Sequence, residues 1–350
     1  MNRRNFVVSL GAGVVGATVC RAATQPAPKI VSPSTGLAKQ LAFSRHINDR
    51  RTVSEYLNGP IQSFRTSFNE DGTIDYDGVR TFVDHCIVGG SKTILLTAGD
   101  SHLTCMTNEE IATLTRTVCE HTAGRAMIVA ADRNSRTVTS VKFAEYAKSV
   151  GASVLMCQPP TWAQVSATSV AEHYVQVSQH LLVMVVTNVF SSEPAMGVEA
   201  IGTALQRSKN VVAIKDDIFG DLGDGVCKIV KGSGAILFAG GLNKNHLWLL
   251  ERGCGSCYMA TFLAFAPQTE HRYWKAVEAD DLKQAQAVVD QYETPLFDQL
   301  RALPCGWNAG MHATLALHGI TKRWLPKPYL SASDKTMEQL KDFLRQKELL

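Results

Sequence analysis

Short apolar runs alternate with longer amphipathic stretches along the chain from about residue 60 onward. The apolar runs have the length of buried strands and fall at 61–66, 93–97, 127–131, 153–157, 182–187, 211–215, 235–239 and 254–258. The stretches between them space their apolar positions as a helix does, for example at 76–88, 108–121, 137–150, 170–179 and 198–207. Eight strands that alternate with helices predict an α/β fold, the parallel (β/α)8 TIM barrel.

A doubly wound open sheet is the alternative to a barrel. That fold would place a glycine-rich phosphate-binding turn after the first strand, and the segment 67–72 does not have that composition. We therefore predict one barrel over residues 58–275, preceded by a linker and a short N-terminal helix over 24–57 and followed by a C-terminal helical extension over 276–350. In a barrel the reactive groups gather at the carboxyl ends of the strands.

The first 23 residues have the layout of a twin-arginine export signal. Arg3 and Arg4 precede a short stretch rich in glycine and alanine at residues 7–19, and small residues follow at 22–23. The apolar stretch is short for a membrane-spanning helix. The sequence therefore predicts an exported, periplasmic protein that is not stably inserted in a membrane after export. The alternatives are an uncleaved membrane anchor and a basic N-terminus that arose by chance.

The charge composition indicates which kinds of binding partner are not expected. The formal net charge is +3, and Arg3, Arg4 and Arg21 lie in the predicted leader, so the remainder carries 3 − 3 = 0. A balanced charge argues against nucleic acid or an anionic membrane surface as a partner. Cys254 and Cys257 have the spacing of a metal or redox pair, but in a predicted strand their sulfurs point to opposite faces, so we interpret them as structural.

Lys215 is the candidate with the clearest chemistry. It closes the apolar run 211–214 at the predicted end of the sixth strand, and Asp216 and Asp217 follow it. A lysine in a partly apolar pocket loses basicity and can attack a carbonyl group as the free amine. The alternative is a lysine whose stem is buried and whose ammonium reaches solvent.

Four segments resemble one enzyme family. The segments are 66–75 (Thr-Ser-Phe-Asn-Glu-Asp-Gly-Thr-Ile-Asp), 211–222, 253–256 and the C-terminal region with His318-Gly319, Pro326 and Pro328. Together they are similar to dihydrodipicolinate synthase and N-acetylneuraminate lyase over roughly residues 58–348. The resemblance implies a class I aldolase or lyase in which Lys215 forms a Schiff base with a 2-keto acid. It also implies a homo-oligomer, tetramer or dimer, and neither a metal nor an organic cofactor.

Three segments depart from that family's usual motifs. The loop after the second strand, Gly-Thr-Thr-Gly-Glu in the family, corresponds to Ala-Gly-Asp-Ser-His at 98–102. The fifth strand usually ends in Tyr-Asn-x-Pro, where this chain has Thr-Asn-Val-Phe at 187–190. A Pro-Tyr-Tyr segment is replaced by Pro-Pro-Thr-Trp at 159–162. The phenol that transfers protons in the family is therefore missing.

Asp100 and His102 introduce new acid–base groups at a predicted strand end. An ionised Asp100 would repel the carboxylate of a 2-keto acid, by roughly 4 kcal/mol at about 4 Å and an effective dielectric constant near 20. His102 has the pKa range of a proton carrier at neutral pH. With Lys215 and Thr187 they form the predicted catalytic set, and a solvated turn is the alternative for the loop. The predicted substrate contacts are Gly99, Ser101, Asp132, Arg133, Thr161, Asn188 and Gly240.

The leading hypothesis is a Schiff-base lyase, an aldolase or a dehydratase, that acts on a 2-keto acid, a sugar acid or a related polyhydroxylated carbonyl compound. Dihydrodipicolinate synthesis itself is not expected, because of Asp100 and the predicted export. A non-catalytic small-molecule-binding protein on the same barrel is the alternative. A third hypothesis, a hydrolytic or metal-assisted enzyme, would use Asp100, His102 and Asp132.

Overall fold

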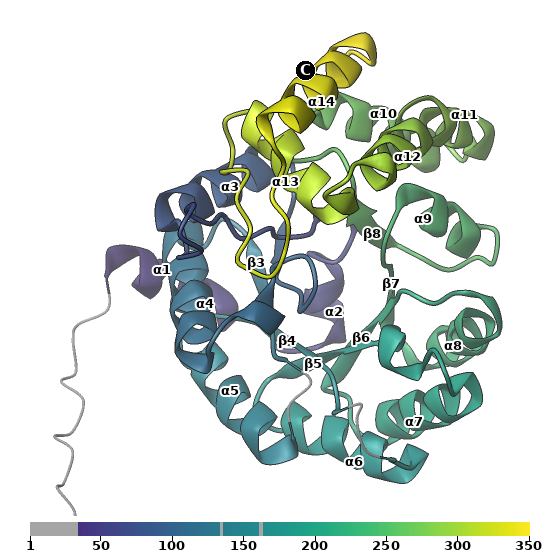
Figure 1. The fold of residues 1–350 in the computed structure, drawn as a ribbon. Helices are drawn as coiled ribbons and strands as arrows, with labels where there is room; N and C mark the ends of the chain where they lie inside the picture. Colours follow the sequence, from purple (N-terminus) through teal and green to yellow (C-terminus); the bar gives the residue numbers. More distant parts are fainter. Residues whose placement is uncertain (1–33, 134–135, 161–163) are drawn as a thin grey trace, which may run out of the picture. The chain divides into compact units, whose positions relative to one another are not determined.

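The computed structural model describes residues 34–133, 136–160 and 164–350. Eight parallel strands form one ring in the order β1-β8-β7-β6-β5-β4-β3-β2, and a parallel bridge between Ser63 and Leu95 joins β1 to β2. This arrangement confirms the predicted TIM barrel and excludes the open sheet (Figure 1). The strands are β1 Gly59–Gln62, β2 Thr93–Leu95, β3 Met127–Ala131, β4 Val154–Cys157, β5 Leu182–Val186, β6 Val211–Asp216, β7 Ile236–Ala239 and β8 Cys257–Ala260.

Eight helices follow the strands and surround the ring (Figure 1). Their bounds are α3 Tyr76–Val88, α4 Asn108–Thr122, α5 Thr137–Ser149, α6 Ala167–Ser178, α7 Pro194–Arg207, α8 Gly220–Ser233, α9 Asn243–Leu250 and α10 Pro267–Glu278. Capping interactions define the first turn of several of these helices. At the start of α4, for example, Thr107 and Glu110 form a capping box. The strands are buried on both faces, which explains their nearly continuous apolar sequences.

The N-terminal region contains two helices where one was expected. They are α1 Thr35–Ser44 and α2 Arg50–Ser54. Arg50 at the start of α2 donates hydrogen bonds to the carbonyl oxygens of Val211 and Ser208, 2.9 and 3.2 Å away, at the amino end of β6. These contacts fix α2 beneath the barrel, opposite the end where the strands terminate. The predicted leader, residues 1–23, and residues 24–33 of the predicted linker lie outside the described residues.

The C-terminal extension is mainly helical, as predicted, and it reaches the barrel. Its elements are α11 Leu282–Val288, the π-helical turn η3 Val289–Glu293, α12 Thr294–Ala302, α13 Gly306–Leu317 and α14 Asp334–Gln346. Asn308 on α13 accepts a hydrogen bond of 2.7 Å from Arg65, which follows β1. The extension therefore forms part of the surface at the carboxyl ends of the strands.

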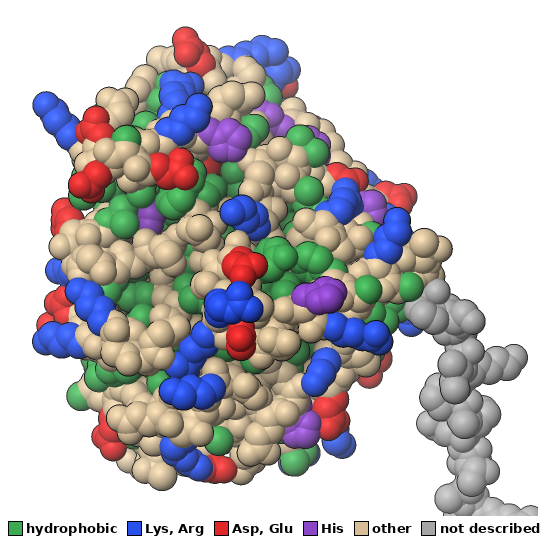
Figure 2. Space-filling model, turned by 180° about the vertical axis from the view of Figure 1, so that it is seen from behind, with side chains coloured by type: hydrophobic (Ala, Val, Ile, Leu, Met, Phe, Trp, Pro, Cys, Tyr) green, Lys and Arg blue, Asp and Glu red, His purple; other side chains and the backbone are tan. Residues whose placement is uncertain are grey.

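The described part of the chain has neither a helix long and apolar enough to cross a membrane nor a group of three His, Cys, Asp or Glu residues arranged to hold a metal ion. The cysteines in these residues are all free; Cys257 is buried in β8, and Cys254 is partly exposed. On the face shown in Figure 2, acidic and basic side chains are interspersed. Positive and negative charges are therefore balanced over the sequence and also mixed on that face.

Candidate functional site

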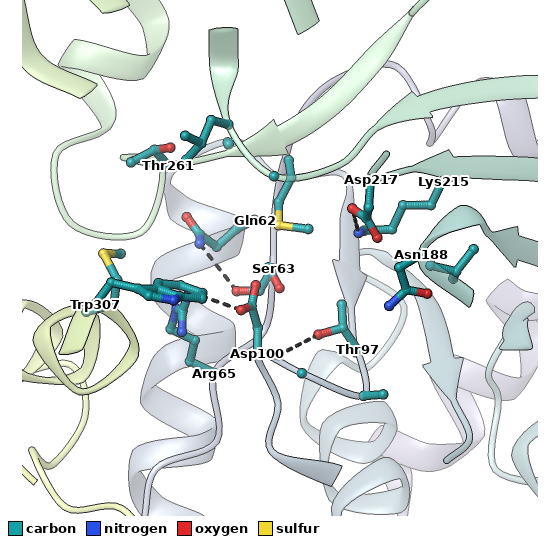
Figure 3. A pocket seen from close by; sticks show the side chains of 18 of the residues that line it. Gln62, Ser63, Arg65, Thr97, Asp100, Asn188, Lys215, Asp217, Thr261 and Trp307 are labelled. Atoms are coloured by element: carbon teal, nitrogen blue, oxygen red, sulfur yellow. Dashed lines mark hydrogen bonds and ion pairs between the residues drawn. The ribbon is translucent and has the colours of Figure 1, made fainter. Parts of the chain in front are cut away.

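One cavity opens at the carboxyl ends of the barrel strands. Its volume is about 350 Å³, and side chains from the strand ends and from α12 and α13 line it (Figure 3). A cavity of this size and place is typical of the active site of a barrel enzyme. The polar side chains in its lining include Arg65, Asp100, Gln158, Asn188, Lys215 and Asp217.

Lys215 lies near the end of β6 and directs its amine into this cavity. The residue is only 5% exposed, so its ammonium group does not reach bulk water as the alternative interpretation required. The side chain of Asp217 contacts the Lys215 Nζ atom directly. The structure therefore places a buried amine and a carboxylate side by side on the cavity wall.

Thr187 holds the turn that carries Asp217. Its hydroxyl donates to Asp216 Oδ1 at 2.8 Å and accepts from the backbone N–H of Asp217 at 2.9 Å. Asp216 Oδ1 also accepts from the backbone N–H of Ile218 at 3.1 Å. Thr187 is fully buried and does not line the cavity, so its predicted place in the catalytic set is corrected. It positions the Lys215–Asp217 pair instead.

The absence of a side chain at Gly240 leaves room for the Lys215–Asp217 pair. A Cβ atom at Gly240 would lie 1.7 Å from Asp217 Oδ1 and 2.8 Å from Lys215 Nζ, far inside van der Waals contact. The predicted substrate contact is therefore corrected: Gly240 lies behind the pair, while Gly241 and Leu242 line the cavity.

Asp100 forms an ion pair with Arg65 across 3.2 Å. Burial raises the pKa of the Asp100 carboxyl group, but the charge of Arg65, a hydrogen bond with Ser63 and the charge of Lys215 together lower it by more, so that the pKa lies below the ordinary value. Asp100 is therefore ionised at neutral pH. The expected repulsion between Asp100 and a substrate carboxylate is corrected, because the Arg65 guanidinium compensates the charge of Asp100.

His102 and Ser101 face away from the cavity. His102 has a left-handed backbone with φ of 57°, and its ring lies between the rings of Phe68, His312 and Tyr329 at centroid distances of 5.0–5.8 Å. Burial and then the charge of Arg65 lower its pKa to about 4, so the ring is neutral at neutral pH. Ser101 is fully buried, and its hydroxyl donates to the carbonyl oxygen of Phe64 at 2.6 Å. The predicted catalytic role of His102 and the predicted substrate contact of Ser101 are thus corrected.

Asp132 and Arg133 are likewise absent from the cavity wall. Asp132 accepts hydrogen bonds from the Ser140 hydroxyl at 2.5 Å and from the backbone N–H of Gln158 at 3.4 Å. Burial raises its pKa to about 7. Arg133 donates to Asn108 Oδ1 at 2.7 Å, at the start of α4. Both residues stabilise loops rather than substrate, which corrects those two predictions; Thr161 lies outside the described residues.

Gly99 and Asn188 line the cavity, as expected for substrate contacts. Asn188 is exposed to the cavity, and its Oδ1 atom accepts a hydrogen bond of 3.0 Å from Gln158 Nε2. The Asn188 amide N–H groups remain directed to a cavity that also contains Lys215 and Asp217 (Figure 3). This group of side chains can orient a carbonyl compound beside the amine.

Sequence reasoning did not place three prominent side chains in the site, Asp217, Arg65 and Trp307, although Asp217 follows Lys215 by two positions. Arg65 lies next to the last residue of the first predicted strand, 61–66, and is thus a charged residue near a strand end, as Lys215 is. Trp307 begins α13, and its indole lies over the Arg65 guanidinium at 5.4 Å. No local pattern marks Trp307, because its position depends on how the C-terminal extension folds back over the barrel.

Comparison with known proteins gives a consistent result. The model of the dihydrodipicolinate synthetase family matches residues 56–347. The probable 5-dehydro-4-deoxyglucarate dehydratase 1 of Streptomyces coelicolor is 25% identical over 301 residues, 83% of this chain and 93% of that protein. The 4-hydroxy-tetrahydrodipicolinate synthase of an Azoarcus species is 23% identical over 257 residues, 72% of this chain and 87% of its own.

Solved structures share the fold. An N-acetylneuraminate lyase from Fusobacterium nucleatum superposes with a TM-score of 0.74 at 14% identity, covering 83% of this chain and 99% of that chain. A prophage protein of the dihydrodipicolinic acid synthase family from E. coli, in complex with pyruvate, gives 0.72 at 20% identity, covering 84% and 99%. At these identities the likeness concerns the fold alone.

Proposed function

We propose that this chain, which belongs to the dihydrodipicolinate synthetase family, is a Schiff-base-forming lyase that acts on a 2-keto acid, a sugar acid or a related hydroxylated carbonyl compound. The observation that carries the proposal is the buried Lys215 amine in a cavity at the carboxyl ends of the strands. The sugar-acid dehydratases among its relatives support this class of substrate.

Asp217 transfers protons at the amine, a role that a tyrosine phenol usually has in the family. Its carboxylate touches Lys215 Nζ and can accept the proton of the ammonium group, so that the free amine adds to the substrate carbonyl carbon. Asp217 can return this proton to the oxygen of the adduct and then transfer a second proton, which the nitrogen loses after it has added, so that the oxygen leaves as water. The resulting protonated imine accepts the electron pair released when a neighbouring C–H or C–C bond breaks, so both dehydration and cleavage follow from it.

Trapping with borohydride tests this proposal. Wild-type protein and Lys215→Ala are incubated with a panel of 2-keto acids and keto sugar acids, reduced, digested and analysed by mass spectrometry. We expect a reduced adduct on the peptide that contains Lys215, and none in the variant. If no carbonyl compound in the panel gives a lysine-dependent adduct, the proposed chemistry is wrong.

A non-catalytic binding protein is the second candidate, and the missing phenol at Thr187 favours it. In that case a ligand would bind with the same affinity to wild type and to Lys215→Ala, and no ligand would be turned over. Calorimetric titration of both proteins with compounds from the panel separates the two candidates.

Export and assembly complete the proposal. The paired arginines Arg3 and Arg4 before the short apolar stretch support export to the periplasm. Replacement of both by lysine should retain the protein in the cytoplasm, as fractionation would measure. We also propose a homo-oligomer, tetramer or dimer; a monomer in analytical ultracentrifugation at micromolar concentration would contradict this.

A further inference from the structure

We propose that Cys227 and Cys254 form an intramolecular disulfide when the protein meets a disulfide oxidant. Cys227 lies on α8, and Cys254 lies in the turn between α9 and β8. The bond closes a loop that contains β7 and α9. Neither cysteine lines the cavity, so this covalent modification is separate from the site of Lys215.

The partner of Cys254 in the structure is not the cysteine that its sequence spacing indicated. Cys257 begins β8 and is fully buried, whereas Cys254 precedes that strand and is partly exposed. Cys254 Sγ lies 3.9 Å from the carbonyl oxygen of Cys227. The Cys254 thiol is also hydrogen-bonded with the Cys227 thiol, so the two sulfur atoms are neighbours.

Two polar contacts hold the turn against α8 on either side of Cys227. Arg252 Nε donates to Asp224 Oδ1 at 2.6 Å, and Lys231 Nζ donates to the carbonyl oxygen of Arg252 at 2.7 Å. Asp224, Cys227 and Lys231 follow one another at helical spacing, so they share one face of α8. Because Arg252 is fixed to this face from both sides of Cys227, Cys254 is kept beside Cys227.

Glycines give the turn the freedom that bond formation needs. Gly253 and Gly255 flank Cys254 and have φ of 62° and 87°, in the left-handed region that favours glycine. The backbone on both sides of Cys254 can therefore adjust without a steric penalty from a side chain. This adjustment lets the sulfur atoms approach from contact to bonding distance while α8 keeps its place.

The reaction is a thiol–disulfide exchange with an oxidant such as glutathione disulfide. Cys254 is the thiol that reaches solvent, whereas Cys227 is buried. Burial, and then the hydrogen bond with Cys254, raise the pKa of Cys227 to about 12, so this thiol is protonated at neutral pH. Cys254 therefore loses its proton first and attacks a sulfur of the oxidant, which releases one thiol and leaves a mixed disulfide on Cys254.

Cys227 completes the exchange. It loses its proton and attacks Cys254 Sγ, which breaks the mixed disulfide and releases a second thiol. Two cysteine thiols are thus oxidised to one disulfide, the oxidant is reduced to two thiols, and the two protons pass to these thiols. The proposed export would bring the protein to a compartment that contains such oxidants, but the reaction itself needs only the oxidant.

Peptide mapping tests the proposal. The whole protein is reduced, freed of reductant, treated with glutathione disulfide, alkylated in denaturant and digested without reduction. Mass spectrometry should find the peptides of Cys227 and Cys254 joined to each other, and neither joined to Cys105 or Cys305, which are also partly exposed. Recovery of both as alkylated cysteines, or of Cys254 joined to glutathione or to a second chain, would overturn the proposal.

Three variants confirm the pair. Cys227→Ala lacks the thiol that closes the bond, so Cys254 should retain glutathione after the same treatment. Oxidation should raise the melting temperature of wild type by about 5 °C, because the cross-link restricts the unfolded chain. Cys305→Ser is the matched control and should show the same rise, whereas Cys254→Ser should show none.

No rise in wild type, or an equal rise in Cys254→Ser, would overturn the assignment of the bond. None of these measurements uses the Lys215 amine or the export signal. Failure of the disulfide and failure of the proposed function are therefore distinguishable.

Discussion

Lys215 Nζ and Asp217 are in direct contact, two positions apart at the end of β6. Lys215 belongs to the strand and Asp217 to the turn that follows it, and both side chains line the cavity. The fixed turn after β6 and the absence of a side chain at Gly240 maintain this arrangement. The contact gives the amine a proton acceptor in a chain that lacks the tyrosine of its family.

Asp217→Asn should slow imine formation by about 100-fold or more, because a positioned general base contributes rate factors of this order. The amide keeps the shape of the side chain, so binding of the carbonyl compound should remain. The measurement is the rate of borohydride-trapped adduct in a single turnover. Asp221→Asn, an exposed aspartate on α8, is the matched control and should behave as wild type; equal rates in all three proteins would refute the role of Asp217.

Thr187→Val removes the hydroxyl that connects Asp216 to the backbone of Asp217. The variant leaves the backbone N–H of Asp217 without its partner and removes one of the hydrogen bonds to Asp216 Oδ1, so it should lower the free energy of unfolding by about 1–3 kcal/mol. The adduct should also form more slowly, because Asp217 is no longer held beside the amine. Thr187→Ser keeps the hydroxyl and should recover most of both losses. Denaturant unfolding and the trapping rate measure the two effects, and a fully active Thr187→Val would contradict this account.

His102→Gln should leave the pH dependence of adduct formation unchanged between pH 5 and pH 8. The pKa of His102 is lowered to about 4, so the ring is already neutral across this interval, and it lies outside the cavity. The experiment compares the trapping rate of wild type and variant at each pH. A step near pH 6.5 that disappears in the variant would restore His102 as a proton carrier.

The sequence predicts the barrel and Lys215 well because both depend on short-range pattern. The apolar run 211–214 is a buried strand, and a charged residue at its end is visible without any tertiary contact. His102 could not be placed in this way, because a left-handed backbone turns its side chain to the rear of the loop. Arg65 and Trp307 meet across more than half the chain, and no periodicity encodes such a contact.

Asp132 should make the protein less stable as pH rises through neutrality. Its pKa is raised to about 7 in the folded state, above the unfolded value of 3.8, so the stabilisation is fully present below pH 3.8 and is lost as pH rises through 7. The loss amounts to about 4 kcal/mol. Asp132→Asn can hydrogen-bond the same partners without titrating, so its stability should exceed that of wild type progressively from pH 5 to pH 8. Urea unfolding at each pH measures the difference; parallel curves for the two proteins would be inconsistent with the raised pKa.

Gly240→Ala should abolish the adduct while the barrel remains folded. The added methyl group would lie 1.7 Å from Asp217 Oδ1, so the carboxylate must move away from Lys215, and a displacement of about 1 Å can cost 100-fold in rate. Gly232→Ala is the matched control: it lies on α8 with no atom within 4 Å of the new Cβ, and alanine favours the helix. Melting temperature and trapping rate are measured for both. The same chemical change is made at both positions, so loss of the adduct in Gly240→Ala alone would be due to the clash with Asp217 and Lys215. Normal trapping in Gly240→Ala would show that the amine does not need Asp217 beside it.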